Sequence, residues 1–164
     1  MHLIKIGESK TITATIGTAN ASEPKLVWVP YHPSMIQITE SGMDDEVTGH
    51  AEIKGLKSGV TKLNVVAADT NNYQVQLKIV VLPKQATGVV AETDASTVSL
   101  KWNACTDVDG YVVYRFDDAQ KQWVAIASVE ETSFVDSELN SDTEYLYKIG
   151  TYVSDEETVY EGEQ

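Results

Sequence analysis

The stretch Leu139–Ile149, with the sequence LNSDTEYLYKI, carries the clearest fold signal in the second half of this chain. Leu139 precedes a polar turn, and Tyr145, Tyr147 and Ile149 then alternate along a predicted strand. In a β-sandwich, a tyrosine at such a place can bury its ring while its hydroxyl bonds to the backbone just upstream, which is called a tyrosine corner. The stretch therefore predicts a β-sandwich in the second half, with Tyr145 in a structural role and no chemistry of its own.

The rest of the second half contains further short strands separated by turn residues. The predicted strands are Ala86–Ala91, Val98–Trp102, Tyr111–Phe116, Val124–Val129, Thr132–Val135, Tyr145–Tyr152 and Glu157–Tyr160. Alternation puts Val98, Leu100 and Trp102 on one face. We expect Trp102, Tyr111, Leu139 and Tyr145 to be structural residues of this sandwich.

The first half shows the same period of two. Ile12, Ala14 and Ile16 share a face, and no segment keeps a helical apolar period. The predicted strands are Leu3–Ile6, Lys10–Ile16, Leu26–Val29, Ile36–Ile38, Ala51–Ile53, Gly59–Ala67 and Gln74–Val81, and the predicted turns are Gly17–Asn20, His32–Ser34, Ser41–Asp45, Lys57–Gly59 and Asp69–Asn72. This pattern predicts a second sandwich or barrel, with Trp28 in its core.

A boundary between two domains is predicted near Leu82–Gln85. Val75–Val81 alternates and then becomes continuously apolar, as a closing strand does, and Pro83 removes a backbone donor and ends it. A new series of strands follows. The sequence therefore predicts an all-β chain of two domains, residues 1–83 and 84–164, with a linker too short for free movement.

The charge of the chain is uneven. Residues 1–83 hold seven Lys against eight Asp and Glu, a net charge of −1, whereas residues 84–164 hold five Lys and Arg against seventeen Asp and Glu, a net charge of −12. Such a negative second half repels phosphate backbones, so we expect no nucleic-acid binding there. Anionic membrane surfaces are disfavoured for the same reason.

Targeting and redox features are few. No apolar run approaches the roughly 18 residues that span a bilayer, so direct membrane insertion is not expected. The N-terminal residues MHLIKIGESK lack the apolar region of a secretion signal. We therefore expect an excised fragment whose export and anchoring signals lie elsewhere. The single cysteine, Cys105, cannot form an internal disulfide.

Catalytic patterns are missing from the sequence. His2, His32 and His50 all lie in the first half, far in sequence from Cys105, so no nucleophile has an obvious base. Carboxylate pairs occur, but all of them fall in predicted turns, where acids are normally solvated. Motifs for phosphate binding or zinc hydrolysis do not occur. We expect neither an enzyme nor a cofactor.

Two binding hypotheses remain open. Asp107 and Asp109 stand two residues apart before Gly110, somewhat as in a calcium loop, although the further oxygen ligands of such a loop are missing. Trp123, Tyr31 and Tyr114 are candidates for an exposed aromatic surface that stacks on sugar rings. In each case the alternative is structural: a polar turn for the aspartates, and cross-strand packing for the aromatic residues.

Residues 86–164 resemble a fibronectin type III domain. The resemblance is carried, in order, by STVSLKW with Trp102, DGYVVYR with Tyr111, TSFVDSEL with Leu139 and TEYLYKI with Tyr145. Residues 1–83 are similar to a bacterial immunoglobulin-like domain of group 2. That similarity runs through IGESKTITATIGTANA, KLVWVPYHPSMIQI with Trp28, and IKGLKSGVTKLNVVA, with extra residues expected around Met43–Ala51.

These resemblances imply a fold, a location and a role. The fold is two tandem immunoglobulin-like β-sandwiches. The location is the surface or exterior of a bacterium, where such modules form stalks, adhesin segments and accessory domains. The implied role is a non-catalytic spacer whose partners are other domains of the same larger protein. The alternative is a protein- or carbohydrate-binding adhesion module, acting through sandwich-end loops or an edge strand on cell-wall polysaccharide or a surface protein.

Overall fold

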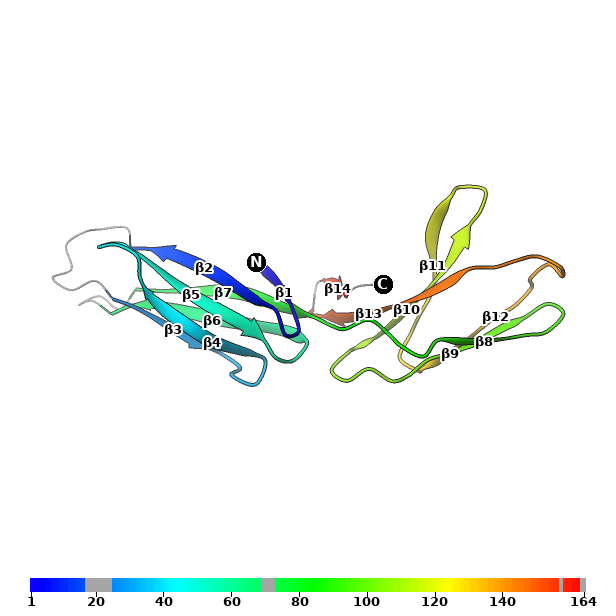
Figure 1. Cartoon of the computed structure of the whole chain (residues 1–164), viewed down its shortest axis with the longest axis horizontal. Coiled ribbons are helices and arrows are strands. Elements are labelled where there is room, and N and C mark those ends of the chain that lie inside the picture. Colours follow the sequence, from blue (N-terminus) through cyan, green and yellow to red (C-terminus); the bar gives the residue numbers. More distant parts are fainter. Residues whose placement is uncertain (17–24, 69–72, 157, 163–164) are drawn as a thin grey trace. The chain divides into compact units, whose positions relative to one another are not determined.

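The computed structural model describes residues 1–16, 25–68, 73–156 and 158–162, which form strands, turns and loops. The chain divides into two compact units, Met1–Leu82 and Pro83–Gln164 (Figure 1). The predicted all-β fold class is confirmed. The predicted turns Gly17–Asn20 and Asp69–Asn72 lie outside the described residues. Within the described residues no helix is long and apolar enough to cross a membrane.

Two sheets make up the first unit. One has the order β1-β7-β6-β3, formed by His2–Lys5, Gln74–Leu82, Gly59–Ala67 and Leu26–Pro30; the other has the order β2-β5-β4, formed by Ser9–Thr15, Thr48–Gly55 and Ile36–Met43. The strands β1 and β7 are parallel, with His2 opposite Ile79 and Lys5 opposite Leu82. The other strand pairs are antiparallel.

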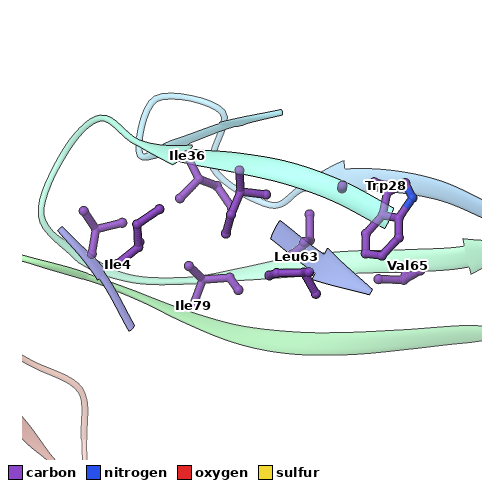
Figure 2. Close-up of a cluster of buried hydrophobic side chains, with 10 residues drawn as sticks. Ile4, Trp28, Ile36, Leu63, Val65 and Ile79 are labelled. Atoms are coloured by element: carbon purple, nitrogen blue, oxygen red, sulfur yellow. The ribbon is translucent and has the colours of Figure 1, made fainter. Parts of the chain in front are cut away.

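The core of the first unit follows from the alternation of its strands. In β5, Gly49, Ala51, Ile53 and Gly55 are buried and the residues between them are half-buried. Figure 2 shows the apolar side chains that the two sheets place between them. The buried cluster comprises Ile4, Ile12, Trp28, Ile36, Ala51, Ile53, Leu63, Val65, Ile79 and Val81. Burial of each larger side chain stabilises the unit by roughly 1.5–3 kcal/mol.

The second unit also has two sheets. One has the order β11-β10-β13-β14, formed by Gln122–Val129, Gly110–Asp117, Tyr147–Ser154 and Val159–Glu161; the other has the order β12-β9-β8, formed by Ser133–Asp136, Val98–Lys101 and Val90–Thr93. Its core contains Ala86, Val98, Leu100, Trp102, Tyr111, Val113 and Ile149. The rings of Trp102 and Tyr111 meet edge to face, with centroids 5.4 Å apart.

One predicted strand starts later than expected. Ala86–Ala91 was predicted as a strand, whereas β8 begins at Val90. Gly88 has φ +66, which breaks the extended backbone, and the Asn103 side chain lies directly over it. Asn103 N–H also donates to Thr87 O at 2.9 Å. The loop before β8 is therefore held by Asn103 rather than by strand pairing.

The predicted turn at Ser41–Asp45 is also shifted. β4 continues through Met43, and the hairpin turns after it, before β5 begins at Thr48. The Asp45 carboxylate accepts hydrogen bonds from Val47 N–H at 2.8 Å and Thr48 N–H at 2.6 Å, which fixes the turn there. These backbone hydrogen bonds also lower the pKa of Asp45. Most of the extra residues expected around Met43–Ala51 therefore extend the β4–β5 hairpin.

Candidate functional site

Four side chains from neighbouring strands form an aromatic group on the outer face of the β11-β10-β13-β14 sheet. Phe116 lies opposite Trp123, and their ring centroids are 5.4 Å apart in an edge-to-face arrangement. Tyr114 lies opposite Lys148 on the next strand. The Lys148 Nζ atom is 4.9 Å from the ring centroid of Tyr114 and 4.9 Å from that of Trp123. Lys148 therefore bridges two aromatic rings on neighbouring strands.

This group joins two of the three residues proposed for sugar binding. Trp123 is 38% exposed and Tyr114 is half-buried, with its hydroxyl donating to Glu161 Oε2 at 2.6 Å. The third candidate, Tyr31, belongs to the first unit, where it is 61% exposed and packs edge to face on His32. Because the Lys148 ammonium lies against the rings of Trp123 and Tyr114, a stacked sugar would compete with it for space. Sugar binding stays a prediction.

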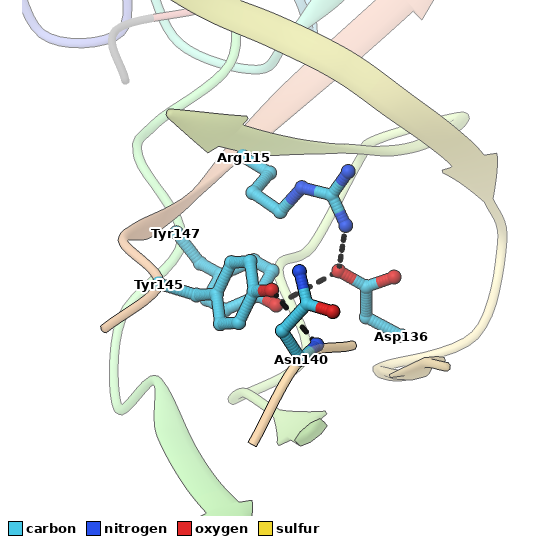
Figure 3. A network of polar contacts seen from close by, with 5 residues as sticks. All are labelled: Arg115, Asp136, Asn140, Tyr145 and Tyr147. Carbon is cyan, nitrogen blue, oxygen red and sulfur yellow. Dashed lines mark hydrogen bonds and ion pairs between the residues drawn. The ribbon is translucent and has the colours of Figure 1, made fainter. Parts of the chain in front are cut away.

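On the other side of the same sheet, an ion pair is half-buried in the second unit. Arg115 Nη1 donates to Asp136 Oδ2 at 2.8 Å, and the Tyr147 hydroxyl donates to the same oxygen at 2.8 Å (Figure 3). Burial and the hydrogen bond to Asp136 both raise the pKa of Tyr147. Partial burial alone would lower the pKa of Arg115, but the hydrogen bond and charge of Asp136 outweigh it and raise the pKa. The network is therefore held with Arg115 charged and Tyr147 neutral.

Tyr145 lies beside this network and makes the hydrogen bond of a tyrosine corner. Its hydroxyl accepts from Asn140 N–H at 3.0 Å, as Figure 3 shows. Its ring lies 5.7 Å from the Arg115 guanidinium carbon. Leu139, just upstream, packs against the core of the unit. The strand expected from Tyr145 starts only at Tyr147, because the chain at Tyr145 turns its side chain back toward the preceding loop.

The calcium candidates have separate positions in the turn before β10. Asp109 Oδ2 accepts hydrogen bonds from Ser154 N–H at 2.6 Å and Ser154 Oγ at 2.8 Å, which ties the turn to β13. Asp107 is exposed, with φ +60. Among the residues that the structure describes, no three His, Cys, Asp or Glu side chains are grouped so as to hold a metal ion. Calcium binding stays a prediction.

The remaining titratable candidates lie apart. Cys105 N–H donates to the Tyr111 hydroxyl at 2.8 Å, and burial raises the pKa of the Cys105 thiol. His32 Nδ1 lies 3.0 Å from Thr61 Oγ1, and His50 Nδ1 lies 2.6 Å from Asp44 Oδ1, both in the first unit. Raising the thiol pKa disfavours the thiolate that a cysteine nucleophile needs.

Sequence reasoning missed the group that the structure brings together around Asp136 and Lys148. The role of Arg115 could have been predicted, because it continues the inward alternation of Tyr111 and Val113. A charged side chain that points inward from a strand needs an oppositely charged or hydrogen-bonding partner. The partner, Asp136, is more than twenty residues away in another strand and carried no such signal. The local sequence around Lys148 did not indicate its contacts either, because its neighbours Tyr114 and Trp123 are determined by strand register.

Two open depressions lie at the end of the second unit that holds the tyrosine corner. One, of about 370 Å³, lies between the β8–β9 turn and the loop from Leu139 to Tyr145. The other, of about 330 Å³, is lined by Val124, Ile126, Tyr145 and, among its charged residues, Arg115, Asp117, Asp118 and Glu144. Both are open to solvent and acidic at their rims.

Comparisons with known proteins point to the fold. No protein-family model matches the chain. Over 62 residues, 36% of this chain, it is 40% identical to an α-amylase from Niallia circulans, and that stretch is 4% of the enzyme's length. The chain therefore spans only a small part of this relative.

Among solved structures, a two-domain fibronectin type III segment of chicken tenascin aligns with 95% of this chain and 92% of its own, with a TM-score of 0.52 and 14% identity. Domains A168–A170 of titin align with 99% of this chain and 59% of their own, with a TM-score of 0.44 and 15% identity. A Fn3-like protein from Clostridium thermocellum aligns with 49% of this chain and 88% of its own, with a TM-score of 0.39 and 23% identity. The tenascin likeness shows the fold: consecutive sandwiches of the fibronectin type III or immunoglobulin-like type.

Proposed function

We propose that this chain is a non-catalytic spacer segment of a bacterial cell-surface or secreted multidomain protein. The observation that carries the proposal is the parallel pairing of β1 with β7, from His2 opposite Ile79 to Lys5 opposite Leu82. Within the given sequence, β1 is the first strand of this unit and β7 is its last. Pulling the beginning of β1 away from the end of β7 moves the paired strands in opposite directions, so their hydrogen bonds are loaded together in shear.

The fold and the comparisons support this role. Fibronectin type III-like sandwiches are generally non-catalytic and commonly act as spacers or binding modules of multidomain proteins. The α-amylase from Niallia circulans contains a similar stretch that is only 4% of its length, which is consistent with a module inside a long chain. We also propose that the first unit is a group 2 bacterial immunoglobulin-like domain, that its neighbours in the parent protein are the main partners, and that cell-wall polysaccharide or a surface protein is a further partner.

Single-molecule pulling tests the load-bearing part of this proposal. In a Cys105→Ser background, handles are attached through Lys84→Cys and either Met1→Cys or Glu8→Cys. Glu8 follows β1, and its N–H donates to Lys5 O, so it lies at the end of the sheet where β7 finishes. Pulling from Met1 shears β1 along β7, whereas pulling from Glu8 opens the unit from one end.

We expect the first unit to unfold at clearly higher force when it is pulled from position 1 than from position 8. Both variants keep every strand, so a difference reports the direction of loading rather than the stability of the fold. Chemical denaturation of the two variants serves as the control and should give matching free energies of unfolding. Equal unfolding forces for the two attachment points would contradict the load-bearing role.

A further inference from the structure

The edge strands of the four sheets differ in how they are protected. An exposed strand edge can pair with another chain, and proteins usually blunt it by shortness, charge, proline or a β-bulge. Seven edge strands follow this rule: β1, β2, β4, β8, β12 and β14 each carry a charged residue, and β3 ends in Pro30. The eighth, β11, is eight residues long and its sequence, QWVAIASV, contains no charge and no proline. A β-bulge between Ala125 and Ala127 interrupts its second half, so the regular part of its edge is Gln122–Ala125.

The backbone of β11 presents its hydrogen-bonding groups to the free edge. Phe116 N–H donates to Leu146 O on the β13 side, so the Phe116 backbone faces away from β11. Phe116 and its partner Trp123 therefore form a non-hydrogen-bonded pair, in which the Trp123 N–H and C=O point outward. Ala125, two residues on, points the same way. Figure 1 shows β11 projecting away from the β12-β9-β8 sheet of its own unit.

The side chains at this edge are apolar and accessible. All residues from Gln122 to Ala125 are exposed, including Val124 at 37%. On the inner face, Val124 and Ile126 line the depression of about 330 Å³ described above, together with Tyr145. A strand added beside β11 would place alternate side chains against this depression and the others beside Trp123.

The charge around β11 selects the partner. Asp117 and Asp118 precede the strand, Glu130 and Glu131 follow it, and Glu144 lies on the rim of the depression. Three cations lie nearby: Lys121 is paired with Asp118 at 2.5 Å, Arg115 lines the depression but is paired with Asp136 at 2.8 Å, and Lys148 lies against Trp123 on the other face. The carboxylates around the depression remain in excess. With a net charge of −12 over residues 84–164, a second copy of this chain would be repelled, whereas a basic segment would be attracted.

We propose that the free edge of β11 binds an extended segment of another protein in which apolar residues alternate with lysine or arginine. The segment pairs with β11 as an added strand through the outward backbone groups of Trp123 and Ala125. Its basic side chains lie on the face of the depression, within reach of Asp117, Asp118 and Glu144, and its apolar side chains lie on the other face beside Trp123. This role is separate from the load-bearing role of the first unit, and neither result decides the other.

The test uses the full chain and a short, acetylated and amidated peptide of alternating lysine and valine that carries a fluorophore. Ala125→Pro removes an amide that points outward, so the β10–β11 hydrogen bonds remain, and edge positions tolerate proline. Ala125→Thr is the matched control, because it changes the side chain and keeps the amide. Binding is followed by fluorescence anisotropy, and hydrogen exchange reports the amides of Trp123 and Ala125.

We expect the peptide to bind the unchanged chain and Ala125→Thr, to bind Ala125→Pro roughly tenfold more weakly or not at all, and to slow exchange at Trp123 and Ala125. Glu144→Gln should weaken binding, and added salt should do the same. The proposal is overturned if Ala125→Pro binds as well as Ala125→Thr, if a glutamate–valine peptide binds equally, or if no peptide binds. Self-association of the peptide-free chain that Ala125→Pro abolishes would instead identify a second copy as the occupant.

Discussion

In the first unit the first and last strands pair with each other, whereas in the second unit they lie in different sheets. β1 runs parallel to β7 in one sheet of the first unit. In the second unit β8 pairs with β9, and β14 pairs with β13 in the opposite sheet. The ends of the second unit are therefore not joined by a strand ladder, although both units are sandwiches of similar length.

In the second unit, side-chain hydrogen bonds hold together parts of the chain that are not joined by pairing of the first and last strands. Thr151 Oγ1 donates to Lys84 O at 2.8 Å, which fixes the start of the unit against β13. Asp109 holds the β10 turn to Ser154, and Asp136 joins Arg115 to Tyr147. One architecture can therefore be closed either by backbone pairing of its terminal strands or by polar side chains placed at its turns.

Truncating a core leucine in each unit should cause the greatest loss of stability, and it tests whether the two cores are independent. Leu63 in the first unit is 0% exposed and Leu100 in the second is 1% exposed, so Leu63→Ala and Leu100→Ala remove equivalent contacts. Each should destabilise its own unit by about 2–5 kcal/mol and leave the other unit unchanged. Hydrogen exchange with mass spectrometry in increasing urea measures both units in one sample. Simultaneous loss of protection in both units would show that they unfold as one and would contradict the treatment of the two units as independently stabilised.

A smaller effect concerns the polar network of the second unit. Tyr147→Phe removes the hydroxyl that donates to Asp136 and should destabilise the second unit by about 2 kcal/mol at neutral pH. Because the pKa of Tyr147 is raised in the folded state, the unfolded chain ionises first. The contribution of this group is therefore complete below the ordinary tyrosine pKa of about 10 and is lost as the pH rises above it.

Urea unfolding of the second unit, repeated across the alkaline range, measures this effect. The unchanged chain should lose more stability above pH about 10 than Tyr147→Phe does, so their stability curves should converge. Tyr73→Phe is the control, since Tyr73 is 72% exposed and lies in the first unit. Curves that stay parallel through this range would show that the hydrogen bond from the Tyr147 hydroxyl to Asp136 does not stabilise the second unit.

The sequence predicts the strands of both units better than it predicts the contacts between side chains of different strands. Alternation of apolar residues was enough for the strands, because side chains on a strand point to opposite faces whatever the strand pairs with. The start of β8 was misplaced because Gly88 and Asn103 interrupt the extended chain, and this depends on a contact fifteen residues apart. Pairings such as Arg115 with Asp136, or Lys148 with Trp123, are set by topology and register, which a local pattern does not contain.

The smallest predicted effect belongs to the stretch LNSDTEY itself. Tyr145→Phe keeps the ring beside Arg115 and removes only the hydroxyl that accepts from Asn140 N–H, so the second unit should lose about 1 kcal/mol. Urea unfolding measures the loss, and hydrogen exchange at Asn140 should become faster while exchange in the first unit stays the same. Unchanged exchange at Asn140, with unchanged stability, would mean that the ring alone holds the loop. In that case the tyrosine would stabilise the second unit by packing, as the apolar core stabilises the first, and the contrast between the units would rest on Thr151, Asp109 and Asp136.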